Sequence, residues 1–294
     1  MTESRQHESR ITHHAEYSTQ RTMHTILAPI GEAPPTTWRG VAVVIHGLNL
    51  QPERLRPLVD EVRRWGIGAV CCSLQGHGEN YQPLAGQPVT AARLAAFRQV
   101  SYAGWRGEIL AAYQTAATLA AEHEAPIFLL AFSLGALLGC ELLVTEPTVR
   151  FDRMVLLAPA VALRPVSHLP YLLARWPRVA IRSFSPRAYR ANPATPVAAY
   201  LTLRTALSNV QRHPTPALNV PTLVLIDPQD ELVSLRGIQR LIRRHQLTQW
   251  RLHPIRKQPT RPDARFHHLI IDAECVGPVA WQTMLAQIKG QLGV

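Results

Sequence analysis

Ser133 is the residue whose type and position most strongly suggest chemistry. It follows an apolar run, Pro126 to Phe132, and precedes the small and apolar residues of "LGALLGCELL". A serine in the pattern G-x-S-x-G, between a strand and a helix, lies on a strained turn that projects a nucleophilic hydroxyl. Here the pattern reads "AFSLG", with Ala131 in place of the first glycine, a change that we expect to alter the fit little. A serine that only caps the following helix is the alternative, and the strand–turn–helix setting favours the nucleophile.

A serine nucleophile of this kind works with an acid and a histidine that follow it in the chain. The stretch "VPTLVLIDPQDELVS" offers Asp227, directly after a predicted strand, and Asp230, in the turn beyond it. We prefer Asp230, because a carboxylate in the turn can reach across to a histidine, whereas Asp227 can simply end the strand. Asp263, in the loop "RKQPTRPDARF", is a remote third candidate.

Four histidines come after these acids: His245, His253, His267 and His268. We expect His245, at the end of a basic amphipathic helix, to be solvated, and His253 to fall within or at the end of the last strand. His267 and His268 follow a long loop that could bring an imidazole over the sheet edge. Because two adjacent side chains cannot both point at Ser133, one of the pair is expected to be the base and the other a neighbour.

Backbone N–H groups near the serine are the candidates for stabilising an oxyanion, which acyl transfer requires. The first buried strand ends in "HGLN", His46 to Asn49, where a glycine lets the chain turn close to the site. The Leu48 N–H is therefore one candidate donor, and the Leu134 N–H, directly after the serine, is the second. A simple strand end is the alternative for His46 and Gly47. His77, in the tight turn "QGHGE", is expected to have a structural role only.

Apolar runs alternate with helical patterns from about residue 22 onward. Strands are predicted at 41–47, 68–74, 126–132, 153–159, 221–227 and 248–254, and helices at 52–66, 98–123, 134–144, 236–246 and 276–292. This alternation predicts an α/β fold, with a mostly parallel twisted sheet covered by helices on both faces. Ligands bind beyond the carboxyl ends of such strands, where the candidate residues above are found. We therefore predict a single domain over residues 22–294.

Two segments depart from the alternation. Residues 1–21 are polar and His-rich and are expected to form an N-terminal arm. Residues about 160–216 contain many prolines and short helical pieces, which favours a small helical cap inserted over the sheet. Its apolar residues could line an acyl pocket or pack the cap onto the core: Leu169, Tyr171, Leu172, Leu173, Trp176 and Val179.

The composition is that of a globular protein: 47% of the 294 residues are hydrophobic and 17% are charged. The net charge of +11 arises from scattered basic residues or helix faces such as "RGIQRLIRRHQ", without a nucleic-acid-binding signature. We expect a solvated basic surface and no nucleic-acid partner, and peripheral contact with anionic lipid is an option that the charge allows. Four cysteines without CxxC spacing, no signal-peptide pattern and no apolar run of membrane-spanning length favour a soluble, cytoplasmic protein.

Five motifs together resemble those of the α/β-hydrolase superfamily, most closely its bacterial carboxylesterase and monoacylglycerol lipase branch. They are "VVIHGLN", "LQGHGE", "LLAFSLGA", "PTLVLIDPQDELV" and "FHHLIIDAE", which occur in the family's order and span Val41 to Glu274. The resemblance implies Asp230 as the acid and the Leu48 and Leu134 N–H groups as the oxyanion hole. It favours His267 as the base, since the family's histidine commonly precedes an acidic residue by five positions, as His267 precedes Asp272. The doubled histidine departs from the family pattern and leaves the base ambiguous by one residue.

The resemblance implies a serine hydrolase with the triad Ser133, Asp230 and His267, a covalent acyl-enzyme, and no need for a metal or organic cofactor. The expected substrate is a carboxylic ester with an apolar acyl chain, such as a monoacylglycerol, with a lysophospholipid or another anionic ester as a further option. Hydrolases of amide, peptide or carbon–carbon bonds share this triad, and the fold also occurs in proteins that bind without catalysis. The sequence does not indicate the oligomeric state.

Overall fold

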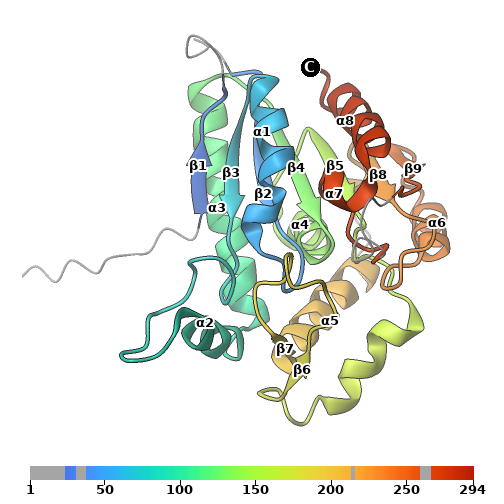
Figure 1. Ribbon diagram of the computed structural model, residues 1–294. Coiled ribbons are helices and arrows are strands. Elements are labelled where there is room, and N and C mark those ends of the chain that lie inside the picture. Colours follow the sequence, from blue (N-terminus) through green and yellow to red (C-terminus); the bar gives the residue numbers. More distant parts are fainter. Residues whose placement is uncertain (1–23, 31–37, 213–215, 259–265) are drawn as a thin grey trace, which may run out of the picture.

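A computed structural model describes residues 24–30, 38–212, 216–258 and 266–294 of the chain (Figure 1). Within them, the main sheet has seven strands in the order β1-β3-β2-β4-β5-β8-β9, and every pair is parallel except β1 with β3. The strands are β1 His24–Leu27, β2 Gly40–Ile45, β3 Ile67–Cys72, β4 Ile127–Phe132, β5 Arg153–Leu157, β8 Thr222–Ile226 and β9 Trp250–Pro254. The predicted mostly parallel sheet is thus confirmed. The predicted N-terminal arm lies outside the described residues.

Helices cover both faces of this sheet. One layer contains α1 (Arg56–Arg64), α7 (Ala273–Val276) and α8 (Pro278–Leu292), and the other contains α3 (Tyr102–Glu122), α4 (Leu134–Thr145), α5 (Val197–Arg212) and α6 (Leu235–Arg244). The remaining short elements are η1 (Pro52–Leu55), α2 (Val89–Phe97) and η3 (Pro216–Leu218). Central strands such as β2 and β4 read as continuous apolar runs because helices bury both of their sides.

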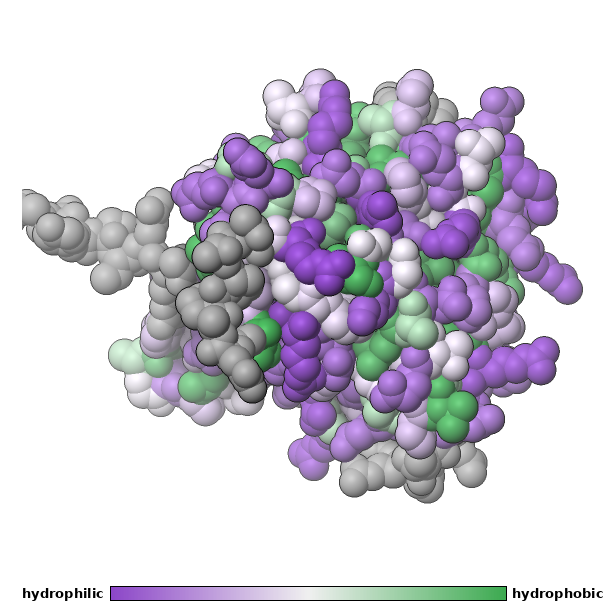
Figure 2. Space-filling model, turned by 90° about the horizontal axis from the view of Figure 1, so that it is seen from above, coloured by the Kyte–Doolittle hydropathy of each residue, from purple (hydrophilic) through white to green (hydrophobic). Residues whose placement is uncertain are grey.

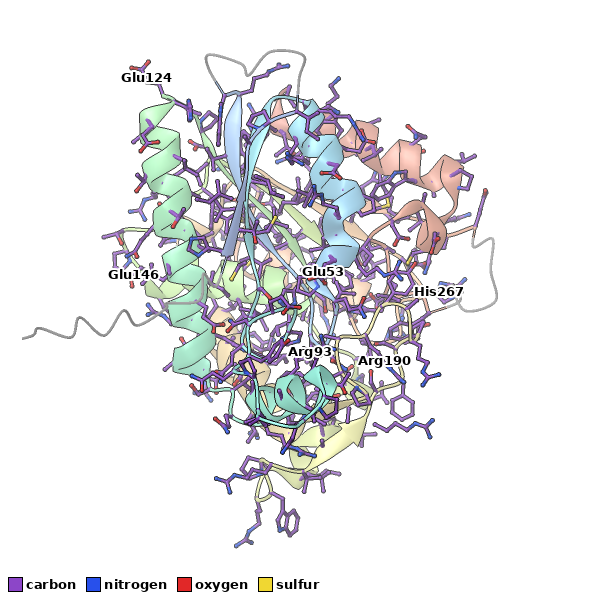
Figure 3. All side chains as sticks on the ribbon, turned by 60° about the vertical axis from the view of Figure 1, so that its left-hand side comes forward. Glu53, Arg93, Glu124, Glu146, Arg190 and His267 are labelled. Atoms are coloured by element: carbon purple, nitrogen blue, oxygen red, sulfur yellow. The ribbon has the colours of Figure 1, made fainter. Side chains whose placement is uncertain are left out.

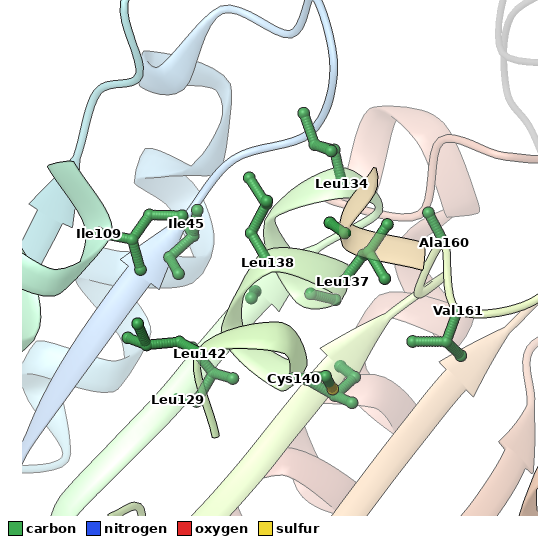
Figure 4. Close-up of a cluster of buried hydrophobic side chains, with 14 of the residues drawn as sticks. Ile45, Ile109, Leu129, Leu134, Leu137, Leu138, Cys140, Leu142, Ala160 and Val161 are labelled. Carbon is green, nitrogen blue, oxygen red and sulfur yellow. The ribbon is translucent and has the colours of Figure 1, made fainter. Parts of the chain in front are cut away.

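Helix α4 is the most deeply buried helix and fixes the start of the site. Its residues Leu134 to Leu143 are all buried, and they pack with side chains of β2, β4 and α3, as Figure 4 shows. The helix approaches β2 so closely that a Cβ on Gly135 would collide with the carbonyl oxygens of Ile45 and His46. The first turn of α4 is therefore held tightly against the end of β2.

Three elements differ from the sequence prediction, and one of them, helix α2, was not predicted at all. The predicted helix 98–123 begins only at Tyr102, because the Ser101 side chain accepts a hydrogen bond from the Gly104 N–H and caps the helix there. The edge strand β1 was not predicted. It pairs antiparallel with β3 and has an alternating, half-exposed pattern too short to stand out in the sequence.

The segment between β5 and β8 lies beyond the carboxyl ends of the strands, in the lower part of Figure 1. It contains η2 (Pro165–Leu173), the two-stranded sheet of β6 (Ala180–Arg182) and β7 (Ala194–Pro196), and helix α5. We call residues 160–212 of this segment the cap. In the described residues, no helix combines the length and the apolar composition that crossing a membrane requires.

Candidate active site

Ser133 occupies the sharp turn between β4 and α4. Its backbone has φ 53° and ψ −112°, a conformation that costs a residue with a side chain about 1–3 kcal/mol. The turn is held from three sides, because the Ser133 N–H donates to Leu157 O and its carbonyl accepts from the N–H groups of Leu137 and Ala160. A strained serine fixed in this way presents its hydroxyl at the sheet edge instead of capping the helix, and no cap hydrogen bond from its side chain is present.

The Ser133 hydroxyl is hydrogen-bonded to a histidine that in turn contacts a buried acid. Ser133 Oγ lies 2.7 Å from His268 Nε2, and His268 Nδ1 lies 2.8 Å from Asp230 Oδ2. An ionised carboxylate can only accept, so Nδ1 carries the proton and Nε2 of the neutral ring is free to accept from the serine hydroxyl. The three side chains are 7% exposed or less, which shields this chain of hydrogen bonds from water.

His267 does not contact Ser133, and the sequence prediction that placed it beside the serine is wrong. Its Nδ1 lies 2.9 Å from Asp227 Oδ2, and its side chain is 29% exposed. His268 points inward and packs against the ring of Phe132, at a centroid distance of 5.1 Å. The residues 227, 230, 267 and 268 thus form two neighbouring Asp–His pairs, of which only the inner one reaches the serine.

Asp272, whose place five residues after His267 favoured that histidine in the sequence, has a structural role instead. Its carboxylate accepts a hydrogen bond from the Cys275 N–H and caps helix α7, and it also accepts one from the Tyr189 hydroxyl. Of the other candidates, His245 follows the end of α6 and His253 lies in β9. Asp263 lies outside the described residues.

Asp230 is held as an anion although it is fully buried. Burial favours the neutral acid, but His268 and the N–H groups of Val233 and Leu232 stabilise the carboxylate, so the pKa of Asp230 lies below its usual value. Both N–H groups donate to Oδ1 at 2.8 Å, which leaves Oδ2 for the imidazole. This arrangement fixes the direction of the carboxylate as well as its charge.

Glu231 holds the backbone of the histidine loop, a role that the sequence analysis missed. Its two carboxylate oxygens accept hydrogen bonds from the N–H groups of His267, at 2.8 Å, and His268, at 3.0 Å. The adjacent acid Asp230 holds the His268 side chain. Neighbouring acids on one turn therefore fix both the backbone and the ring of the same histidine. The "DE" pair at the end of a strand was the available signal.

The Leu48 and Leu134 N–H groups lie where the sequence analysis expected oxyanion donors. Leu134 is the first residue of α4, so its N–H has no acceptor within the helix, and the helix dipole adds partial positive charge there. Leu48 lies in the turn after β2 and lines the same cavity as Ser133. Neither N–H donates a hydrogen bond within the described part of the chain. Both N–H groups are therefore candidates for binding an oxyanion.

Two buried histidines support the turn that carries Leu48. His46 Nδ1 donates to Gly47 O and its Nε2 accepts from the Leu74 N–H, while His77 Nε2 accepts from the Asn49 N–H at 3.0 Å. Burial lowers the pKa of His46 to about 4, against a smaller raising effect of its bond to Gly47. Burial, and then the neighbouring His46, also lower the pKa of His77. Both rings are consequently neutral, and their role is structural, as expected for His77.

A cavity of about 500 Å³ lies between the cap and the sheet, with Ser133 and His268 in its wall. Its lining is mainly apolar, and within the described residues it contains no Asp or Glu. Of the six apolar cap residues named from the sequence, only Leu169 and Leu173 line it. Leu172 and Trp176, by contrast, are 77% and 57% exposed and so neither line the cavity nor pack onto the core.

The parallel sheet, the serine on a strained strand–helix turn and the Asp–His pair beside it define an α/β-hydrolase. Residues 36–195 match the family model described as serine aminopeptidase, S33, which is more than half of the chain, and the protein belongs to this family. The superfamily predicted from the sequence motifs is thus confirmed. No curated protein matches the chain significantly.

Solved structures with the same fold include several lipases at low sequence identity. A soluble variant of monoglyceride lipase from Saccharomyces cerevisiae is 12% identical with a TM-score of 0.71, covering 92% of this chain and 90% of that one. The structure reported with LipS and LipT, metagenome-derived lipolytic enzymes, is 18% identical with a TM-score of 0.67 and coverages of 91% and 96%. Monoacylglycerol lipase from Paleococcus ferrophilus is 16% identical with a TM-score of 0.61 and coverages of 91% and 98%. At these identities the likeness establishes the fold.

Proposed function

We propose that this protein is a serine hydrolase that cleaves carboxylic esters with an apolar acyl chain. The observation that carries the proposal is the Ser133 Oγ, 2.7 Å from His268 Nε2 in the wall of a mainly apolar cavity. A hydroxyl hydrogen-bonded to a buried, oriented imidazole is an activated nucleophile. A cavity of this size and character suits an acyl chain better than a polar ligand.

The mechanism follows the general triad chemistry. His268 Nε2 takes the proton of the Ser133 hydroxyl as its oxygen attacks the ester carbonyl, and Asp230 stabilises the imidazolium that forms. The N–H groups of Leu48 and Leu134 stabilise the tetrahedral oxyanion, each donor being worth about 3 kcal/mol. His268 then protonates the leaving alcohol, and a water activated by the same ring hydrolyses the acyl-enzyme. The residues themselves supply every group that these steps need.

The family description raises aminopeptidase activity as a second candidate, and the cavity argues against it. An aminopeptidase has to bind the positively charged amino terminus of a peptide, which calls for an acidic side chain near the nucleophile. The described cavity lining has no carboxylate, and its one cationic side chain of fixed charge is Arg182. An ester with an apolar acyl group, neutral or anionic in its alcohol part, fits this lining better.

Labelling with a fluorophosphonate probe tests the nucleophile. We expect labelling of the folded protein at Ser133 and none in Ser133→Ala. A series of nitrophenyl esters of increasing acyl length, compared with the anilide of the preferred acid, then tests the bond class. Faster cleavage of the longer acyl esters and slow cleavage of the anilide are expected. Folded protein that is not labelled, or an anilide cleaved as fast as its ester, would overturn the proposal.

A further inference from the structure

Most of the net positive charge of the protein lies in the cap, +8 of +11. Residues 160–212 contain eight of the 31 basic residues and not one Asp or Glu, so the rest of the chain has 23 Lys and Arg against 20 Asp and Glu. The eight are Arg164, Arg175, Arg178, Arg182, Arg187, Arg190, Arg204 and Arg212. Among the described residues none of them forms an ion pair with a carboxylate. The cap is therefore strongly cationic, and its arginines 175, 178, 182 and 187 are exposed without a carboxylate partner in the described part of the chain.

The same surface exposes large apolar side chains. Six lie between residues 166 and 184, and the outermost are Phe184, 87% exposed, and Leu172, 77% exposed. The full set is Val166, Leu169, Leu172, Trp176, Val179 and Phe184. Single exposed apolar residues are common on protein surfaces, but six within one short segment mark an interaction site.

Cationic and apolar residues alternate along this part of the chain. In "LLARWPRVAIRSF" the arginines 175, 178 and 182 stand next to or between Leu172, Trp176 and Phe184. In Figure 3, Arg190 of the cap and Arg93 of α2 lie in the lower half of the molecule, whereas Glu124 lies at the opposite, upper end. That opposite end is covered mainly by hydrophilic residues, with hydrophobic ones scattered among them (Figure 2). We call the exposed apolar and cationic residues between positions 164 and 187 the cap surface.

The cap surface is continuous with the cavity. Val166, Leu169 and Phe184 are each more than half exposed, and all three also line the cavity that holds Ser133. Arg182 is likewise exposed and lines the same cavity. A partner bound at the cap surface would therefore adjoin the entrance to the candidate active site.

We infer that the cap surface docks on an anionic lipid membrane. The exposed arginines match the phosphate groups of anionic lipids, and the apolar side chains between them match the acyl boundary just beneath. Two copies of this surface face to face would bring free arginines together without an acid to pair with, which disfavours self-association. A nucleic acid offers phosphates but nothing to cover leucine, valine and phenylalanine side chains. Docking does not depend on the proposed ester hydrolysis, although it would place the cavity entrance at the lipid.

Sedimentation with lipid vesicles tests this inference on the full-length protein. We expect the protein to bind vesicles of equal parts phosphatidylglycerol and phosphatidylcholine, to bind less as salt is raised, and to bind phosphatidylcholine alone weakly. The variants Leu172→Ser with Phe184→Ser, and Arg175→Gln with Arg178→Gln, should each weaken binding on the order of tenfold. These side chains are exposed, so the variants should unfold at the same temperature as the wild type.

Matched control variants lie away from the cap. Val279 in α8 is 68% exposed, and Arg240 and Arg243 are exposed residues of α6. Val279→Ser and the pair Arg240→Gln with Arg243→Gln should bind the anionic vesicles like the wild type. The inference is overturned if wild-type protein does not sediment with anionic vesicles, or if control and cap variants lose binding equally. It is also overturned if the protein is a dimer that the cap variants dissociate. Fluorophosphonate labelling of Ser133 reports separately on the proposed function.

Discussion

The carboxylate of Glu231 accepts the backbone N–H of His268 at 3.0 Å, one residue along the chain from the acid that binds the ring of the same histidine. The other Glu231 oxygen accepts the N–H of His267. These two bonds and the bond from His268 Nδ1 to Asp230 attach the histidine loop to the turn after β8, beside the outer bond from His267 Nδ1 to Asp227. The position of the His268 imidazole relative to Ser133 depends on the first three.

Removing the Glu231 carboxylate should slow the reaction without removing any group that touches substrate. We expect Glu231→Ala to lower kcat by about tenfold to a hundredfold, because small displacements of a catalytic group carry penalties of this size. Glu231→Gln keeps one acceptor oxygen and should lose less. Ester hydrolysis and the rate of fluorophosphonate labelling measure the effect, and thermal unfolding controls for folding. Wild-type kcat in folded Glu231→Ala would contradict the positioning role.

The two adjacent histidines provide a matched pair for assigning the base. His268→Ala should lower kcat by about 10⁴- to 10⁶-fold, the range found for removal of triad members. His267→Ala should retain kcat within about tenfold, since His267 contacts Asp227 and only its neighbour reaches the serine. Steady-state hydrolysis of a nitrophenyl ester measures both. A larger loss of kcat in His267→Ala than in His268→Ala would identify His267 as the base.

The strained turn at residue 133 should lower the stability of the protein when this residue has a Cβ. Glycine adopts a positive φ without the steric penalty of a Cβ, whereas alanine keeps that penalty. We therefore expect Ser133→Gly to be more stable than Ser133→Ala by about 1 kcal/mol, with activity lost in both. Urea unfolding of the two inactive variants measures the difference. Equal stability would show that the turn stores no strain at this residue.

Gly135 should tolerate no side chain. A methyl group there would collide with backbone oxygens of Ile45 and His46, which cannot move without shifting β2. We expect Gly135→Ala to destabilise the protein by about 2 kcal/mol or more and to lower activity, because overpacking next to backbone is poorly relieved. Gly290 in α8 has open space at its Cβ position and is the control. Gly290→Ala should stabilise the fold by up to about 1 kcal/mol through its higher helix propensity. Urea unfolding measures both variants.

The buried neutral His46 should make the protein less stable as the pH falls. Its pKa is about 4 in the fold against 6.5 for the free side chain, so between these values the unfolded chain binds the extra proton. Stability from this group is complete above the unfolded pKa and is lost as the pH falls from about 6.5 to about 4, at a cost of about 3 kcal/mol. The lowered pKa of His77 acts in the same direction.

Unfolding free energies at about pH 7 and about pH 5 measure this effect. His46→Gln cannot titrate and should show a smaller loss of stability over that range than the wild type. An unchanged pH dependence in the folded variant would mean that other groups cause the loss.

Cytoplasmic location and the absence of a nucleic-acid partner stay predictions from the sequence.

Features that depend on a short stretch of chain could be predicted from the sequence. The strands were visible as apolar runs, since burial on both faces leaves no alternation to obscure them. The turn at Ser133 was visible because a strand, a serine, a glycine and a helix follow one another within a few residues. Asp230 could be preferred over Asp227 because its place in the turn beyond β8 is a local property.

Features that depend on contacts between distant segments required the tertiary structure. His267 and His268 differ in the direction of their side chains, and that direction goes with contacts to Asp227, Asp230 and Glu231 in the distant turn after β8. The sequence could list the apolar residues of the cap, but which of them face the cavity and which face solvent follows from how the cap lies on the sheet. The sequence by itself determined the fold and singled out Ser133, because local patterns and burial specify both. Only the tertiary structure decided which histidine lies beside Ser133 and which cap residues are exposed, because these depend on packing between segments far apart in the chain.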